Sequence, residues 1–326
     1  MRNILSSIFV AGSMVVASSA LSAQTLQLAH NAAEGNPKWE ASELFAQLVE
    51  ETTGGEIKVD VGGNAQYGDD MEALTQMRMG TLALSANSQG ATSSVVPQFS
   101  VLGLPFLFDS LPEAWRVMDG EVGDELKALA ENNGLVLLAL WDNGIRHVSN
   151  SVKPIETPED LRGMQIRTPP DEMTVDIFEA LGANPTPMNF SELYIALQQG
   201  VVDGQENPLM NIYSSKLHEV QDYISMTGHK YESTPILMSK MVWDSLSPEH
   251  QGAIQEAALE AGEFNRQASL AADEELKGRM IEAGIEFNDV DTAPFIEATS
   301  SVYDAWREQY PDLVDMVINA VQNDAR

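Results

Sequence analysis

Two arginines in the middle of the chain have the residue type and the setting to bind a carboxylate. Arg167 ends the apolar segment 164–167 shortly before a proline, and Arg146 follows the very apolar segment 135–140. We expect both at the C-terminal ends of strands, where ligands bind in α/β folds. A guanidinium can donate two parallel hydrogen bonds to a carboxylate, a geometry that lysine cannot supply. The alternative for either arginine is a structural ion pair with one of the chain's many carboxylates.

Asn207 is a third candidate for binding an anion or a hydroxyl group. It stands in the stretch 200–208, Gly-Val-Val-Asp-Gly-Gln-Glu-Asn-Pro. This pattern predicts an apolar strand, a tight glycine turn, three polar side chains and a helix that begins at Pro208. An amide beside a helix N-terminus can contact an anion, and its plainer role is to cap that helix.

The sequence lacks the motifs of several enzyme classes. It has no Gly-x-Ser-x-Gly elbow, Walker loop, His-Glu-x-x-His or Gly-x-Gly-x-x-Gly. Its five histidines have no metal-ligand spacing, and no pair of carboxylates stands out as catalytic. We therefore predict a binding protein that is not an enzyme and that has no metal and no cofactor.

The charge of the chain also limits its partners. Asp and Glu number 49 against 18 Lys and Arg, which gives a formal net charge of −31. Such a chain repels nucleic acid and acidic lipid surfaces, so we predict no nucleic-acid partner. A protein this negative must gather positive groups at one place to bind an anion. The absence of cysteine excludes disulfides, cysteine metal ligands and thiol nucleophiles.

Residues 1–23 are predicted to be a secretory signal peptide. A basic start is followed by an apolar stretch at 4–16 and a zone of small residues at 17–23. The apolar run is shorter than the roughly 20 residues of a transmembrane helix. We expect cleavage after Ala23, with Ala20 as the alternative site and an uncleaved anchor as the alternative interpretation. The mature chain is then expected in the periplasm.

The elements that must position these groups alternate between strands and helices. Strands are expected at 25–29, 57–61 and 82–85, with helices between them that begin at Pro37 and at Asp69-Asp70. This βαβαβ order predicts a parallel sheet covered by helices. Later helices are expected at 112–131, 171–181, 191–199 and 293–323, the last broken near Pro311, and later strands at 135–140, 164–167 and 235–241.

Residues 248–283 predict one long helix, because they are rich in Ala, Glu and Leu and contain almost no helix breaker. At 1.5 Å per residue it is about 50 Å long, longer than one small domain is wide. We therefore predict a two-lobed α/β fold with the ligand in the interlobe cleft and this helix spanning both lobes. Lobe I comprises residues 24–145 and about 233–272, and lobe II comprises residues 146–232 and about 273–326.

Several short motifs occur together in a fixed order. They are Gly-Leu-Pro-Phe-Leu-Phe at 103–108, Asn-Gly-x-Arg at 143–146, Gly-x-x-Ile-Arg-x-Pro at 163–169, Pro-Thr-Pro-Met at 185–188, Ser-Glu-Leu-Tyr-x-Ala-Leu-Gln at 191–198 and Gln-Glu-Asn-Pro at 205–208. The set resembles the extracytoplasmic solute receptors of tripartite ATP-independent periplasmic (TRAP) transporters, the DctP family, over essentially the whole mature chain. The resemblance implies a monomeric receptor that closes around a small carboxylate and delivers it to sodium-driven membrane permease subunits.

The resemblance also implies roles for single residues. Arg167 matches the family's arginine that forks onto the ligand carboxylate, and Arg146 and Asn207 match the groups that support it. Asn31 and Phe190 match ligand contacts of the sialate-binding members.

Other positions depart from the sialate-binding pattern. Ser88 and Ala91 replace a glutamate and an arginine, so a sialate is not expected. His30 and Gln89 provide neutral polar groups for ligand hydroxyls, and Glu72 provides an acceptor unless it is a solvated helix-face charge. This favours a sugar acid such as a uronate or aldonate. The alternatives are a four-carbon dicarboxylate or a keto acid and, from other classes, a secreted enzyme acting on a sugar acid or a ligand sensor.

Overall fold

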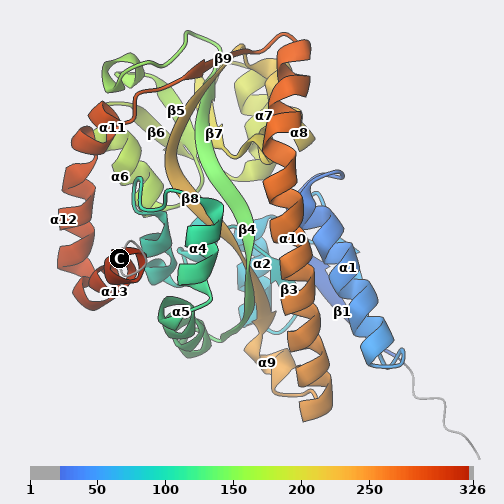
Figure 1. The fold of residues 1–326 in the computed structure, drawn as a ribbon. Coiled ribbons are helices and arrows are strands. Elements are labelled where there is room, and N and C mark those ends of the chain that lie inside the picture. The colour runs from blue at the N-terminus through green and yellow to red at the C-terminus, as the bar shows by residue number, and fades with distance from the viewer. Residues whose placement is uncertain (1–22, 323–326) are drawn as a thin grey trace, which may run out of the picture.

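The computed structural model describes residues 23–322, which build one sheet with helices on both of its faces (Figure 1). The strand order is β2-β1-β3-β8-β4-β7-β5-β6, with β9 beside β8. The strands are β1 (Gln24–Ala29), β2 (Ile57–Gly62), β3 (Leu84–Ala86), β4 (Leu135–Asn150), β5 (Gln165–Thr168), β6 (Asn184–Pro187), β7 (Gly204–Asn207), β8 (Tyr223–Ser239) and β9 (Glu286–Asp289).

The first part of the chain forms the parallel βαβαβ unit that its alternation predicts. β1 pairs in parallel with both β2 and β3, and α1 (Pro37–Thr52) and α2 (Asp70–Arg78) connect them. Asn36 caps α1 by accepting a hydrogen bond from the Lys38 backbone N–H at 2.9 Å. β3 begins at Leu84, two residues later than the pattern indicated.

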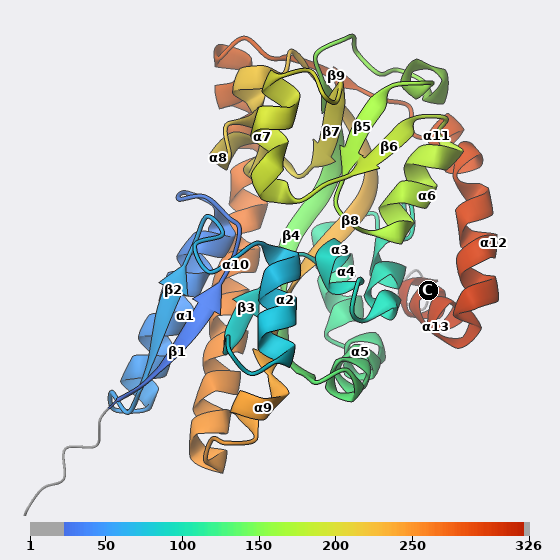
Figure 2. The same ribbon diagram turned by 180° about the vertical axis from the view of Figure 1, so that it is seen from behind.

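Two long antiparallel strands join the lobes. β4 has 16 residues and β8 has 17, and they pair along most of their length. Figure 2 shows β1, β2 and β3 beside one end of this pair and β5, β6 and β7 beside the other. We propose that the chain passes from one lobe to the other between residues 145 and 146 in β4 and between residues 232 and 233 in β8. These two positions are adjacent in the sheet, because Gly144 pairs with Glu232.

The prediction that the strand ends at Leu140 is wrong. β4 continues to Asn150, so Arg146 lies within the strand, opposite Lys230, and not at its C-terminal end. The extension is polar, and its hydrogen-bonding partners in β7 and β8 are far away in the sequence. Apolar patterning along the chain alone therefore did not reveal it.

The long helix α10 (Pro248–Glu282) has 35 residues and runs along both lobes, as predicted (Figure 1). Trp141 of β4 donates from its indole N–H to the Ala258 carbonyl oxygen at 2.8 Å. Its ring packs against Gly262, where a Cβ would come within 2.8 Å of the indole. The helix also packs against α1 in lobe I and α8 (Leu209–Ser214) in lobe II.

Two helical segments are more divided than expected. The predicted helix 112–131 is α4 (Leu111–Met118) and α5 (Glu121–Asn132). The chain turns so tightly between them that a Cβ on Gly123 would lie 1.9 Å from the Met118 carbonyl oxygen. The last segment breaks at Pro311, as predicted, and also at Thr299. It forms α11 (Ala293–Ala298), α12 (Ser300–Gln309) and α13 (Pro311–Gln322).

The remaining helices are short. They are α3 (Gln89–Thr92), α6 (Glu172–Ala180), α7 (Phe190–Gln198), α9 (Lys240–Trp243) and the 3₁₀ helices η1 (Pro97–Gly103), η2 (Pro158–Leu161) and η3 (Leu217–Val220). Apart from Ala23, the predicted signal peptide lies outside the described residues. From residue 23 to residue 322, no helix combines the length and the apolar content needed to cross a membrane.

A buried carboxylate beneath α10 predicts how stability depends on pH. Burial raises the pKa of Asp142 to about 6, although its hydrogen bond from the Trp115 indole opposes this rise. The folded state therefore binds an extra proton between about pH 4 and pH 6, so the free energy of unfolding falls as the pH rises through this window. Asp142→Asn is expected to remove that loss and to raise the free energy of unfolding at pH 7.5 by about 1–2 kcal/mol. Urea unfolding at several pH values measures it; an unchanged slope between pH 4 and pH 6 would contradict it.

Candidate functional site

A narrow polar cleft lies between the lobes, and its enclosed cavity has a volume of about 30 Å³. The lobe I wall includes Asn31, Lys38, Asp69, Asp70 and Ser88. The lobe II wall includes Arg167, Asn189, Phe190, Asn207 and Asn211, and the crossing strands contribute Arg146 and Glu232.

The lobe I wall is built from the loops that follow three parallel strands. Asn31 follows β1, Asp69 and Asp70 follow β2 at the start of α2, and Ser88 follows β3. The C-terminal ends of parallel strands meet at one edge of a sheet, which is where α/β proteins place their ligands. In lobe II, Arg167 likewise lies one residue before the end of β5.

Arg167 is a buried cation with an oriented guanidinium. Its Nε and Nη2 both donate to the Met188 carbonyl oxygen, at 3.0 and 2.6 Å, and its guanidinium carbon lies 5.7 Å from the centre of the Phe190 ring. Burial lowers the pKa of Arg167 to about 10, so it remains charged at neutral pH. Within the described part of the chain it has no ion pair. Such a group is suited to receive an anion.

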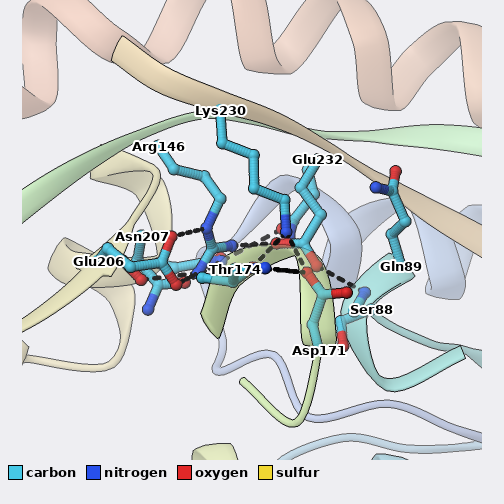
Figure 3. A network of polar contacts seen from close by, with 12 residues as sticks. Ser88, Gln89, Arg146, Asp171, Thr174, Glu206, Asn207, Lys230 and Glu232 are labelled. Atoms are coloured by element: carbon cyan, nitrogen blue, oxygen red, sulfur yellow. Dashed lines mark hydrogen bonds and ion pairs between the residues drawn. The ribbon is translucent and has the colours of Figure 1, made fainter. Parts of the chain in front are cut away.

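Arg146 is also buried, but carboxylates of the protein balance its charge. Its guanidinium forms ion pairs with Glu206 and Glu232 and donates from Nη2 to the Glu206 carbonyl oxygen at 2.6 Å (Figure 3). Burial by itself would lower its pKa, but the two carboxylates outweigh burial and raise the pKa above its ordinary value. The structural ion pair that was the alternative for both arginines therefore occurs at Arg146 and not at Arg167.

Asn207 ends β7 and does not cap the following helix. α8 begins at Leu209 after Pro208, and no side chain caps it. The Asn207 amide donates to Gln205 Oε1 and accepts a hydrogen bond from Asn211 Nδ2 at 3.1 Å. These bonds fix the amide in the wall of the cleft.

Three of the candidate residues do not line the cleft. His30 is buried beside Trp39, with ring centres 5.3 Å apart, and burial lowers its pKa to about 3. Gln89 Oε1 accepts hydrogen bonds from the backbone N–H and hydroxyl of Ser233, at 3.1 and 2.9 Å. Glu72 is exposed on α2. In contrast, Arg167, Arg146, Asn207, Asn31 and Phe190 all lie together in the cleft wall.

The sequence interpretation missed several residues of the site. The sequence pattern assigns Asp70 only to a helix start and gives no role to Lys38, Glu206 or Glu232. A lysine in the first turn of a helix is an unfavourable choice, because it faces the positive end of the helix dipole. That signal was available for Lys38. None was available for the partners of Arg146, which come from β7 and β8.

A second buried ion pair lies near Glu232 but does not line the cleft. Lys230 Nζ donates to Asp171 Oδ2 at 2.5 Å and to Thr174 Oγ1 at 2.6 Å. The Ser100 hydroxyl donates to Asp171 Oδ1 at 2.6 Å, which connects η1 with the start of α6. Figure 3 shows this group next to Glu232, whose Oε1 accepts the Gly90 N–H at 2.8 Å. The network joins α3, α6 and the crossing strands.

Hydrogen bonds also connect the two rims of the cleft. On one side the Ser191 hydroxyl donates to Asp69 Oδ2. On the other, Asn36 Nδ2 donates to Asn211 Oδ1 at 2.9 Å and to Ser214 Oγ at 3.2 Å. The structure therefore has a closed cleft. Within residues 23–322, no three His, Asp or Glu side chains are grouped so that they could hold a metal ion.

Two sets of strands joined by two long strands, with a buried cation in the cleft between them, define a two-lobed α/β solute-binding protein. The family model described as "Bacterial extracellular solute-binding protein, family 7" (DctP) matches residues 28–309. The chain belongs to this family, which is extracytoplasmic, and its relatives are TRAP solute-binding proteins. The family and the fold predicted from the motifs are thereby confirmed.

Two curated relatives show the extent of the likeness. The chain is 51% identical over 285 residues to an uncharacterized protein of Sinorhizobium fredii, covering 87% of this chain and 52% of that protein, so it spans about half the relative's length. It is 34% identical over 319 residues to the 2,3-diketo-L-gulonate-binding periplasmic protein YiaO of Escherichia coli, covering 97% of both chains.

Solved structures of similar chains carry bound acids. A TRAP solute-binding protein from a Sulfitobacter species with bound β-D-galacturonate is 34% identical, with a TM-score of 0.88 over 92% of this chain and 100% of the other. The sugar acid binding protein of Advenella mimigardefordensis in complex with galactonate is 31% identical, with a TM-score of 0.90 over 93% and 99%. A relative from Sulfurospirillum deleyianum with bound succinate is 32% identical, with a TM-score of 0.86 over 91% and 98%.

Proposed function

We propose that this chain is the periplasmic receptor of a TRAP transporter, that it binds a monocarboxylic sugar acid such as a uronate or aldonate, and that it delivers this ligand to a sodium-driven permease. The observation that carries the proposal is Arg167, a buried and oriented guanidinium without an ion pair among the described residues. A ligand carboxylate would supply the missing counter-charge. Arg146 would then orient the site, since its own charge is already balanced by Glu206 and Glu232.

The charges in the cleft favour a ligand with one carboxylate. Three cations line it (Lys38, Arg146 and Arg167) together with three carboxylates (Asp69, Asp70 and Glu232). Glu206 adds a fourth carboxylate directly behind Arg146. The four carboxylates already exceed the three cations by one, so one ligand carboxylate raises the negative excess to two, and a second would raise it to three at a buried position.

The neutral groups of the cleft favour hydroxyls. Amide side chains line both walls, and each can donate to one hydroxyl and accept from another. Hydroxyl groups of a ligand could use the remaining hydrogen-bonding capacity of these amides, which a plain hydrocarbon middle could not. The relatives with bound galacturonate and galactonate support the same ligand class. The amides are Asn31, Asn143, Asn189, Asn207 and Asn211.

Closure of the cleft gives the receptor its mechanism. A ligand that contacts Arg167 in lobe II and Asn31 in lobe I interacts with both walls only when the lobes are closed. It therefore stabilises the closed form by its differential affinity for that form. The protein forms no covalent bond to the ligand and delivers it unchanged to the permease.

A thermal-shift panel tests the ligand class. We expect D-galacturonate, D-galactonate or D-glucuronate to stabilise the purified protein, because a ligand at 100 times its Kd adds about 2.7 kcal/mol to the free energy of unfolding. A shift with succinate alone would instead favour a four-carbon dicarboxylate, the second candidate, which the succinate-bound relative supports. A shift with pyruvate alone would favour a keto acid. Loss of the compound on prolonged incubation would indicate an enzyme.

A further inference from the structure

Lys38 is a buried lysine in the cleft wall that has few partners. Its side chain is on the first turn of α1, and the residue is 3% exposed. Its ammonium lies 3.5 Å from Asn31 Oδ1, which is its one hydrogen bond within residues 23–322. In the same range no carboxylate is within ion-pair distance of Nζ. At least two of its three donors are therefore available to a molecule in the cleft.

Burial makes a charged lysine at this position costly for the fold. Burial lowers the pKa of Lys38, although the more distant charges of Asp70 and Glu232 oppose the change. The first turn of a helix also disfavours a cation, because the helix dipole is positive there. A residue that is unfavourable for both reasons is expected where it serves function.

The neighbours of Lys38 complement its donors with acceptors. Asn31 Nδ2 donates to Asp70 Oδ2 at 3.0 Å, and the Ser88 N–H donates to the same oxygen at 3.2 Å. All four residues line the cleft. A hydroxyl group donates one hydrogen bond and accepts others, so an ammonium beside a carboxylate can satisfy adjacent hydroxyls. A second ligand carboxylate would meet the negative charges of Asp69 and Asp70 as well as the ammonium of Lys38.

We propose that Lys38 is a specificity-determining residue that donates hydrogen bonds to the hydroxyl oxygens of the sugar acid on the lobe I side, with Asn31 and Asp70 as the acceptors beside it. This rests on the proposed function, since Arg167 must hold the carboxylate in lobe II for the hydroxyls to reach lobe I. The subsite selects polyhydroxylated monocarboxylates over short acids and over dicarboxylates.

Lys38→Met tests the proposal, because methionine keeps an unbranched chain and removes the charge. We expect the affinity for D-galacturonate and D-galactonate, measured by isothermal titration calorimetry, to fall about 10- to 100-fold, as for a lost charge-assisted hydrogen bond. The affinity for glycolate, a short acid that reaches only Arg167, is expected to stay unchanged. Thermal unfolding without ligand is expected at the wild-type temperature or above. Lys58→Met is the matched control, since Lys58 is half exposed on β2 and pairs with Glu50.

The outcomes separate this proposal from the proposed function. Unchanged sugar-acid affinity in Lys38→Met, with binding abolished in Arg167→Ala, would overturn the Lys38 subsite and leave the receptor function standing. An equal loss of glycolate affinity would also overturn it, because Lys38 would then act on the carboxylate. Binding of no sugar acid by the wild type would refute both. If Lys38→Met does not fold, Lys38→Gln, which retains a donor, is expected to fold and to lose less affinity.

Discussion

Replacing Arg167 with alanine is expected to weaken sugar-acid binding by roughly two to three and a half orders of magnitude, or about 3–5 kcal/mol. The loss is large because the ligand carboxylate would still be buried in the closed cleft but would have no cation beside it. Arg146 cannot replace Arg167, since Glu206 and Glu232 already neutralise it. Titration calorimetry with the best acid of the panel measures the change.

Two further variants make this result specific. Arg167→Lys keeps a positive charge but loses the planar fork, so its affinity is expected between those of the wild type and Arg167→Ala. Arg162→Ala removes an exposed arginine of the same lobe and is expected to bind normally. Without ligand, Arg167→Ala is expected to unfold at the wild-type temperature or above, because a buried cation has been removed. Wild-type affinity in Arg167→Ala would show that the carboxylate binds elsewhere.

Replacing Arg146 with methionine is expected to lower the free energy of unfolding by about 3–5 kcal/mol. The variant leaves Glu206 and Glu232 buried without their cation. The Arg146 pairing holds the pKa of Glu206 at about 2 even though burial would raise it, which shows how strongly this carboxylate depends on the arginine. Urea unfolding at pH 7.5 measures the loss.

Further substitutions test whether the stability lost in Arg146→Met comes from the unpaired carboxylates or from lost packing. The triple variant Arg146→Met/Glu206→Gln/Glu232→Gln is expected to recover much of the stability, because no unpaired charge remains in this cluster. Arg279→Ala breaks an exposed pair with Glu275 and is expected to leave the free energy of unfolding nearly unchanged. If Arg146→Met were as stable as the wild type, the buried ion cluster would not stabilise the fold.

Local patterns in the sequence determined much of the fold. The alternation of strands and helices up to β3 and the length of α10 follow from periodicity and helix-breaking residues, which act over a few neighbouring positions. The same local information placed Arg167 beside the end of a strand. Short family motifs then placed Asn31, Phe190 and Asn207 in the cleft wall with it.

Only the tertiary structure decided which of the candidate groups share the cleft and which have their charge already balanced. Arg146 obtains its partners from β7 and β8, which are separated from it by 60 and 86 residues, so no local pattern could distinguish it from Arg167. Adjacent side chains after a strand end also face different environments: Asn31 lines the cleft, whereas His30 is buried against Trp39. Because neighbouring side chains point to opposite sides of the backbone, a shift of one residue would reverse which of the two faces the ligand.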